Sequence, residues 1–173
     1  MSGYSTAKRV LPAGALLLAA LFAGCVGAPG MAAYRQGDYA GALREFRAAE
    51  DPTGDFAVGV MAYKGEGVAR DPDAAADWFR RAAEQGYAKA QIFLGGMYAR
   101  GEGVAKDRWE AARWFRMAAE AGNTEAQVYL GVMYARGDGV AKNRDEAVNW
   151  LRKAAAQGSF RAQEYLDRLG ASG

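Results

Sequence analysis

Histidine and cysteine are two of the side chains on which catalysis and metal binding most often depend, and both are scarce in this sequence of 173 residues. It contains no histidine, and its one cysteine is Cys25. Without an imidazole, no Ser/His or Cys/His pair can activate a nucleophile. The missing histidine and the single thiol also argue against a metal site. We therefore predict a non-enzymatic protein with no catalytic residue, no metal site and no cofactor.

Two other patterns could suggest chemistry: carboxylate pairs at Asp71/Asp73 and Asp145/Glu146, and Gly-x-Gly segments at 65–67, 101–103 and 137–139. The acids stand where helices are predicted to start, and there the positive end of the helix dipole favours negative charge. The glycines do not follow predicted strands, as the glycines of a phosphate-binding loop would. We interpret the acids as helix caps and the glycines as turns.

The Gly-x-Gly segments belong to a longer pattern with a period of 36 residues. The residues that recur include Gly95, Tyr98 and Trp114, which return as Gly131, Tyr134 and Trp150. One period earlier, Gly59 and Trp78 occupy the same places. Three copies at one period indicate a repeat protein. The units run over 51–86, 87–122 and 123–158.

Each unit predicts two helices joined by the Gly-x-Gly-Val turn. The second helices begin after a capping residue and end at a glycine, over Asp71–Gly86, Asp107–Gly122 and Asn143–Gly158. One hairpin cannot bury its own apolar face, so neighbouring hairpins must stack. We expect the recurring tryptophans to fill the seams between units. Gly95 and Gly131 should let the paired helices approach closely.

Shorter segments flank the three units. Residues 34–50 have helical spacing and match the second helix of a unit, which predicts a divergent N-terminal capping repeat. Residues 159–173 begin another first helix and then stop, which predicts a C-terminal capping helix and tail. Solenoid proteins need such caps because their terminal units have only one neighbour.

The units share the pattern Ala-x-x-x-Leu-Gly-x-x-Tyr-x-x-Gly-x-Gly-Val-x-x-Asp-x-x-x-Ala-x-x-Trp-Phe-x-x-Ala-Ala. This pattern resembles the Sel-one-like repeat, a relative of the tetratricopeptide repeat, over about residues 51–166. The departures are small, with Ala62 in place of the tyrosine and Asn143 in place of the aspartate. The resemblance implies an all-α fold, a right-handed α-solenoid (superhelix) of stacked antiparallel helical hairpins.

The N-terminus resembles that of a bacterial lipoprotein. Lys8 and Arg9 precede an apolar stretch that is too short to span a bilayer comfortably, and Ala23-Gly24-Cys25 resembles a lipobox. We predict a signal peptide over 1–24, lipidation of Cys25 and a flexible tether over 25–33. An ordinary cleaved signal or an uncleaved anchor is the alternative. Val26 stands where an aspartate would favour the inner membrane, so we expect the outer membrane, facing the periplasm.

The net charge of the chain restricts the classes of partner that it can attract. Lys8 and Arg9 are two of 22 basic residues, so removing the signal peptide leaves 20 basic and 20 acidic side chains. A neutral chain has no basic field to attract nucleic acid. We expect no nucleic-acid partner, attachment to the membrane through the N-terminal lipid, and envelope proteins as partners.

In the family that this sequence resembles, the first helices of the units line the concave side. The candidate partner-binding residues lie mainly on these helices: Lys64, Ile92, Phe93, Arg100, Val128, Tyr129, Val132 and Arg136. Trp109 is added because its counterparts are Asp73 and Asp145. Alternatively, the basic residues form a solvated edge neutralised by acids two positions later, and the aromatic residues serve packing.

The resemblance also implies a function, because repeats of this kind serve mostly as adaptors that assemble complexes. We predict a scaffold lipoprotein of the bacterial cell envelope that binds a partner protein through its concave face. The alternatives are a cell-wall glycan-binding or cell-wall-modifying module, and a protein that only stabilises its partner. Some cysteine-rich secreted relatives carry a cysteine pair in each repeat, which this chain lacks.

Overall fold

Helices follow one another throughout residues 30–171, the part of the chain that our computed structural model describes, and this part contains no strand. The three central hairpins are α4 (Pro52–Lys64) with α5 (Pro72–Glu84), α6 (Ala88–Arg100) with α7 (Arg108–Glu120), and α8 (Thr124–Arg136) with α9 (Arg144–Ala156). They are flanked by α2 (Met31–Gln36) and α3 (Tyr39–Ala48) at one end and α10 (Phe160–Arg168) at the other.

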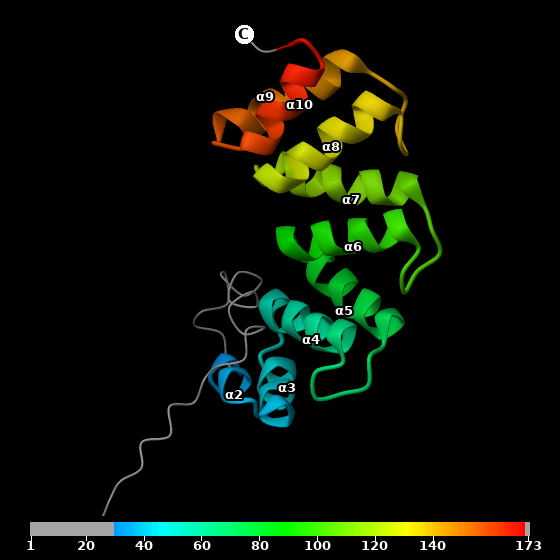
Figure 1. Cartoon of the computed structure of the whole chain (residues 1–173). Coiled ribbons are helices and arrows are strands. Elements are labelled where there is room, and N and C mark those ends of the chain that lie inside the picture. Colours follow the sequence, from blue (N-terminus) through cyan, green and yellow to red (C-terminus); the bar gives the residue numbers. More distant parts are fainter. Residues whose placement is uncertain (1–29, 172–173) are drawn as a thin grey trace, which may run out of the picture.

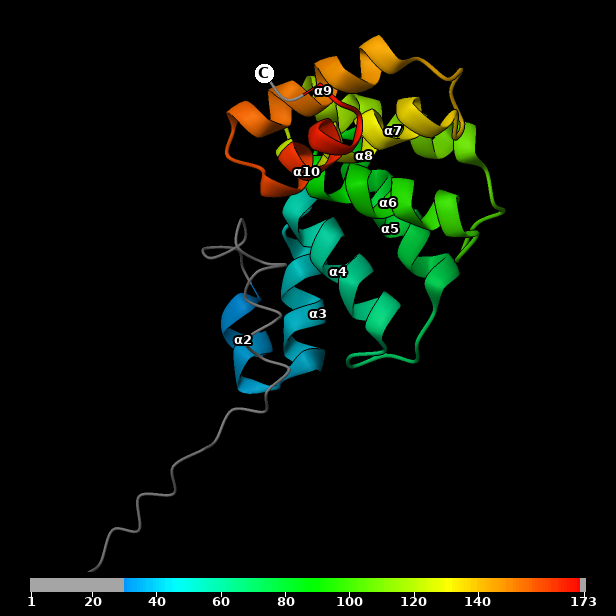
Figure 2. The ribbon, with the colours of Figure 1, turned by 45° about the horizontal axis from the view of Figure 1, so that its top comes forward.

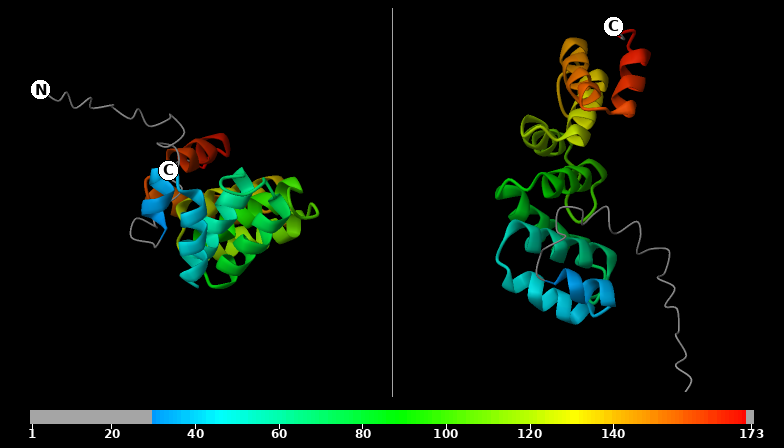
Figure 3. Two further views of the ribbon diagram at one scale, coloured as in Figure 1. Left: turned by 90° about the horizontal axis from the view of Figure 1, so that it is seen from below. Right: turned by 90° about the vertical axis from the view of Figure 1, so that its left-hand side faces the viewer.

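Each helix packs mainly against its neighbours in the sequence, and α10 also reaches α8. The hairpins therefore form a stack that runs from α2 and α3 to α9 and α10 (Figures 1 and 3). The loops within the three central hairpins lie along one side of this stack (Figure 2). This arrangement confirms the predicted all-α solenoid of helical hairpins. None of the helices described combines the length and apolar composition that crossing a bilayer requires.

The predicted caps are present at both ends of the second helices. Asp71 accepts a hydrogen bond from the Ala74 amide, and Asp107 and Asn143 each accept bonds from two amides of the first turn. These bonds satisfy donors that have no partner within the helix. At the other end, Gly86, Gly122 and Gly158 have φ angles of 85°, 89° and 87°. Glycine adopts this left-handed conformation without a steric penalty.

The two glycines of each Gly-x-Gly turn have different roles. The first, such as Gly101, ends the first helix in the left-handed conformation. The second, such as Gly103, lies against the start of the second helix of the preceding hairpin. A Cβ on Gly103 would come well under 3.0 Å from the Pro72 carbonyl group. The second glycine therefore sets how closely successive hairpins stack.

The recurring tryptophans lie at the seams between hairpins, as predicted. Trp114 is 4% exposed and belongs to the N-terminal core cluster, while Phe115 beside it belongs to the middle cluster. Trp150 and Leu151 repeat this division between the middle and C-terminal clusters. Adjacent residues on one helix thus join two layers of core. The predicted close approach at Gly95 is also confirmed, because a Cβ there would lie 3.1 Å from the Phe115 ring.

The N-terminal end differs from the sequence prediction. We predicted a flexible tether over 25–33, but α2 begins at Met31, and Met31 and Tyr34 are buried in the N-terminal core cluster. The apolar contacts of these two side chains hold α2 against the core, and residues 25–29 of the predicted tether lie outside the described residues. The predicted signal peptide over 1–24 and the lipidation site Cys25 lie outside the described residues.

A buried polar position recurs in the first helices and has one unsatisfied member. Gln127 Oε1 accepts a hydrogen bond of 2.8 Å from Gln157 Nε2. The counterpart of Gln127 is Gln91, and its Oε1 atom is buried with no donor among residues 30–171. The reason is in the sequence, because Ala121 stands where the neighbouring repeats have Gln85 and Gln157.

Replacing Ala121 with glutamine should therefore stabilise the protein. The new amide can donate to Gln91 Oε1, and a hydrogen bond of this kind contributes about 1 kcal/mol. Urea unfolding of the two proteins measures the difference. The matched control is Gln157→Ala, which removes the donor to Gln127 and should destabilise by about 1–3 kcal/mol. A destabilising Ala121→Gln would show that Gln91 has no need of a donor.

Candidate partner-binding groove

A groove of about 420 Å³ crosses helices α6, α8 and α10, the first helices of successive hairpins. Two side chains from α7, and Asp138 from the turn after α8, complete its lining. The residues around it are Ile92, Phe93, Gly96, Ala99, Arg100, Arg108, Phe115, Glu125, Tyr129, Val132, Met133, Arg136, Asp138, Arg161 and Tyr165. The groove brings together six of the nine predicted partner-binding residues, namely Ile92, Phe93, Arg100, Tyr129, Val132 and Arg136.

The floor of the groove is built from aromatic rings that the core holds in place. Tyr129 stacks on Phe115 with ring centres 4.9 Å apart. Phe93 packs against the rings of Phe56 and Phe79, at 5.4 and 5.3 Å. Such ring pairs contribute attraction beyond the area they bury. The floor therefore offers a partner a stiff apolar surface.

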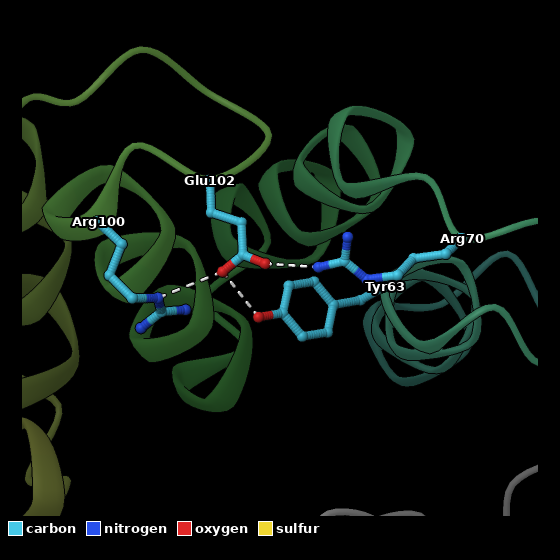
Figure 4. A network of polar contacts seen from close by, with 4 residues as sticks. All are labelled: Tyr63, Arg70, Arg100 and Glu102. Atoms are coloured by element: carbon cyan, nitrogen blue, oxygen red, sulfur yellow. Dashed lines mark hydrogen bonds and ion pairs between the residues drawn. The ribbon is translucent and has the colours of Figure 1, made fainter.

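Arg100, which lines the groove, also belongs to a polar network centred on Glu102 (Figure 4). The Glu102 carboxylate accepts hydrogen bonds of 2.8 Å from the Tyr63 hydroxyl and 2.7 Å from Arg70. Arg100 Nε lies 3.3 Å from the same carboxylate. The Arg100 guanidinium also lies over Gly96, 3.1 Å from where a Cβ would be. Arg100 is therefore positioned beside an acid that it shares with Arg70.

This network lowers the pKa of the Glu102 carboxyl group. The hydrogen bond from Tyr63 is the largest cause, burial opposes it, and Arg100 and Arg70 add to it. Because the folded-state pKa is depressed, the stabilisation is present above the unfolded-state pKa. It is lost as the pH falls through the folded-state pKa.

Replacing Tyr63 with phenylalanine should raise the pKa of Glu102 towards its ordinary value of 4.5. The stability that the network supplies would then be lost at a higher pH than in the unmodified protein. Carboxyl ¹³C chemical shifts followed through a pH titration measure this pKa directly. An unchanged Glu102 titration would show that the arginines alone set it.

The equivalent position in the next repeat is arranged differently. Asp138 forms an ion pair with Arg108 of the preceding hairpin, and Arg136 is exposed. Arg136 pairs with no acid among residues 30–171. The predicted neutralisation by an acid two positions later therefore holds for Arg100 but not for Arg136.

Three predicted binding residues lie outside the groove. Val128 is only 2% exposed and packs in the C-terminal core cluster, so its side chain offers no surface to a partner. Lys64 ends α4, one hairpin before the groove, where burial lowers the pKa of its ammonium group and Glu66 opposes that shift. Trp109 is 63% exposed and lines a separate hollow with Arg113, Arg116, Tyr134 and Val140.

Sequence reasoning missed five polar or charged members of the groove, which are Arg108, Glu125, Asp138, Arg161 and Tyr165. One signal could have found two of them, because Arg161 and Tyr165 follow Glu125 and Tyr129 by one period of 36 residues. Both residues lie in the segment that the sequence predicts to be the C-terminal cap. Within residues 30–171, no group of acidic side chains is arranged to hold a metal ion.

Comparisons with known proteins agree with this geometry. The family model described as Sel1 repeat matches residues 53–87, 88–123 and 124–159. A crystal structure of a Sel1 repeat protein from Oxalobacter formigenes is 37% identical, with a TM-score of 0.73, over 77% of this chain and 56% of that one. The matched segments begin one to two residues after the units read from the sequence.

Two further solved structures are similar. One is c5321, a protective antigen of uropathogenic Escherichia coli with an SLR fold, at 40% identity and a TM-score of 0.69 over 72% of this chain and 27% of that one. The other is Helicobacter pylori cysteine-rich protein B, at 25% identity and a TM-score of 0.59 over 75% and 95%. This chain thus spans about half the length of the Oxalobacter formigenes protein and about a quarter of the length of c5321. No curated protein sequence matches it.

Proposed function

This chain belongs to the Sel1 repeat family, and from that premise we propose that it is a scaffold lipoprotein of the bacterial cell envelope. Sel1 repeat proteins mediate protein–protein interaction in general, and they are typically non-catalytic scaffolds. In this proposal the binding surface is the groove across α6, α8 and α10, and its ligand is another envelope protein.

The observation that carries this proposal is the gathering of six predicted binding residues around one groove. Their side chains combine a stiff aromatic floor with arginines at the rim. Buried or half-buried aromatic residues and arginines are the residue types that contribute most to protein interfaces. The large exposed aromatic Trp109 lies outside the groove, in its own hollow, and marks a second surface that the same experiment can examine.

The membrane attachment rests on the sequence before residue 30. A positively charged start, an apolar stretch and Ala23-Gly24-Cys25 together support lipidation at Cys25. Attached acyl chains would hold the scaffold at a bilayer without a spanning helix. Incorporation of an alkyne-tagged fatty acid that is lost in Cys25→Ser would support this anchor, and incorporation that persists in Cys25→Ser would contradict it.

The function itself is tested by crosslinking in living cells. A photoreactive residue is placed at Phe93, Arg100 or Arg136 in the groove, at Trp109 in the second hollow, and at exposed Arg44 on α3 as a control. We expect one dominant protein adduct from the groove positions that is absent at Arg44. A dominant adduct at Trp109 alone would show that the partner binds at the hollow around Trp109 and not in the groove. Glycan adducts, or none, would replace the scaffold proposal with cell-wall binding.

A further inference from the structure

The charges around the groove do not balance locally. Four arginines and two acids line it. Arg100 pairs with Glu102, and Arg108 pairs with Asp138. This leaves Arg136 and Arg161, which have no acidic partner among residues 30–171, and Glu125 as the one acid in the lining outside these pairs. The groove therefore keeps an excess of positive charge, although the described part of the chain is neutral.

Arg136 is left without a partner because its neighbouring acid is engaged elsewhere. In the preceding repeat, Glu102 is long enough to reach both Arg100 and the adjacent hairpin. Asp138 is one methylene shorter and pairs with Arg108 instead. The counterpart of Arg108 one repeat earlier is Pro72, which has no charge. The unpaired cation is thus a feature of this one turn.

The second cation, Arg161, is positioned by tyrosines. Its guanidinium carbon lies 5.2 Å from the centre of the Tyr129 ring. Hydrogen bonds with Tyr129 and Tyr165 raise the pKa of the Arg161 side chain, and burial opposes this. Both of these partners are phenol groups rather than carboxylates. Arg161 is exposed, so its remaining donors face the groove and solvent.

The two cations lie at different heights along α8. Arg136 is the last residue of α8, while the Arg161 guanidinium, which comes from α10, lies over the ring of Tyr129, seven residues earlier in α8. Seven helical residues span roughly 10 Å at about 1.5 Å each. Val132 of the groove floor lies between these two positions on α8. An extended peptide covers that distance in about three residues.

We propose that the partner enters this groove with an acidic segment, whose carboxylates bind Arg136 and Arg161 and whose apolar side chains lie on the floor between them. This inference rests on the proposed function and specifies the chemistry of the partner. Carboxylate–arginine bonds are among the strongest polar contacts, since both groups are charged. Because the chain has no net charge once the signal is removed, selection for acidic partners must come from the groove itself.

The test uses a phage library of random peptides, selected on the immobilised full chain in detergent. We expect the enriched peptides to carry two acidic residues about three positions apart, with apolar residues between them. The affinity of an enriched peptide is then measured by fluorescence polarisation. Arg136→Gln and Arg161→Gln should each weaken binding by about tenfold or more. The matched control, Arg44→Gln, removes one exposed charge outside the groove and should leave the affinity unchanged.

Three outcomes would overturn this inference in distinguishable ways. Enriched peptides without acids, whose binding is lost in Val132→Glu but survives both arginine substitutions, would refute acidic recognition and leave the scaffold function standing. Acidic peptides that bind the arginine variants and Arg44→Gln equally well would place recognition elsewhere. No enrichment, together with saturable binding to purified peptidoglycan, would refute both proposals. Circular dichroism of each variant, including Val132→Glu at a half-buried position, verifies that the fold is intact.

Discussion

Replacing Gly103 with alanine is expected to destabilise the protein by about 2–5 kcal/mol, through two additive costs. The φ angle of Gly103 is 68°, and an alanine in the left-handed region costs about 1–2 kcal/mol. The new Cβ would also collide with the backbone carbonyl of Pro72, well under 3.0 Å away. A backbone atom at the start of a packed helix cannot rotate aside, and forcing extra atoms into such a contact costs about 1–3 kcal/mol.

The structure supplies a control that separates these costs. Gly122 has a φ angle of 89°, and a Cβ there would meet no atom within 4 Å. Gly122→Ala should therefore cost only the conformational term, about 1–2 kcal/mol. Urea unfolding followed by circular dichroism compares the two variants. Equal losses of stability in both variants would show that hairpin stacking adjusts to a side chain at Gly103. The second glycine of the turn would then be required only for its left-handed φ angle.

The sequence predicted these turns, but not the contact that each second glycine makes. Residue spacing at a fixed period reveals which positions are equivalent, so the hairpins, their caps and the seam tryptophans could be predicted. It does not reveal which surface of the neighbouring hairpin a turn will touch. The contact between Gly103 and Pro72 depends on how far successive hairpins rotate in the stack, and that rotation results from packing along the whole seam.

The lining of the groove was also predicted only in part. Several candidates, such as Val128 and Tyr129, differ from their counterparts in the preceding repeat, and such a difference does not distinguish a surface residue from a core residue that has been repacked. Val128 illustrates the failure, because it differs from Ile92 yet lies in the core, while the next residue, Tyr129, faces the groove. Successive residues on a helix differ by about 100° in direction. A shift of one position can therefore change a residue from the groove surface to the core.

Charge pairing was the least predictable feature of the site. The same spacing of base and acid occurs at Arg100 and at Arg136, but only Arg100 is paired with its own acid. The difference depends on Arg108, which reaches Asp138 from another hairpin. Contacts between repeats decide which arginine keeps a free charge, and those contacts are known only once the hairpins are stacked.

Replacing Phe79 with alanine should also cause a large loss of stability, and this loss should be confined to the helices around Phe79. Phe79 is fully buried between the rings of Phe56 and Phe93. Removing a buried phenylalanine ring costs about 3–5 kcal/mol, since the cavity cannot close completely. In a solenoid each unit is stabilised by its direct neighbours alone. Hydrogen exchange should therefore accelerate in α4, α5 and α6 and remain slow in α8 and α9.

The same substitution connects the core to the groove. Phe93 lines the groove floor and rests on Phe79, so an empty space behind it should let the ring move and weaken peptide binding. Phe160→Ala is the control, because Phe160 is 89% exposed and its loss should change stability by less than about 0.5 kcal/mol. Acceleration of exchange throughout the chain would contradict a core divided into clusters. Unchanged peptide affinity in Phe79→Ala would show that the groove holds its shape without this support.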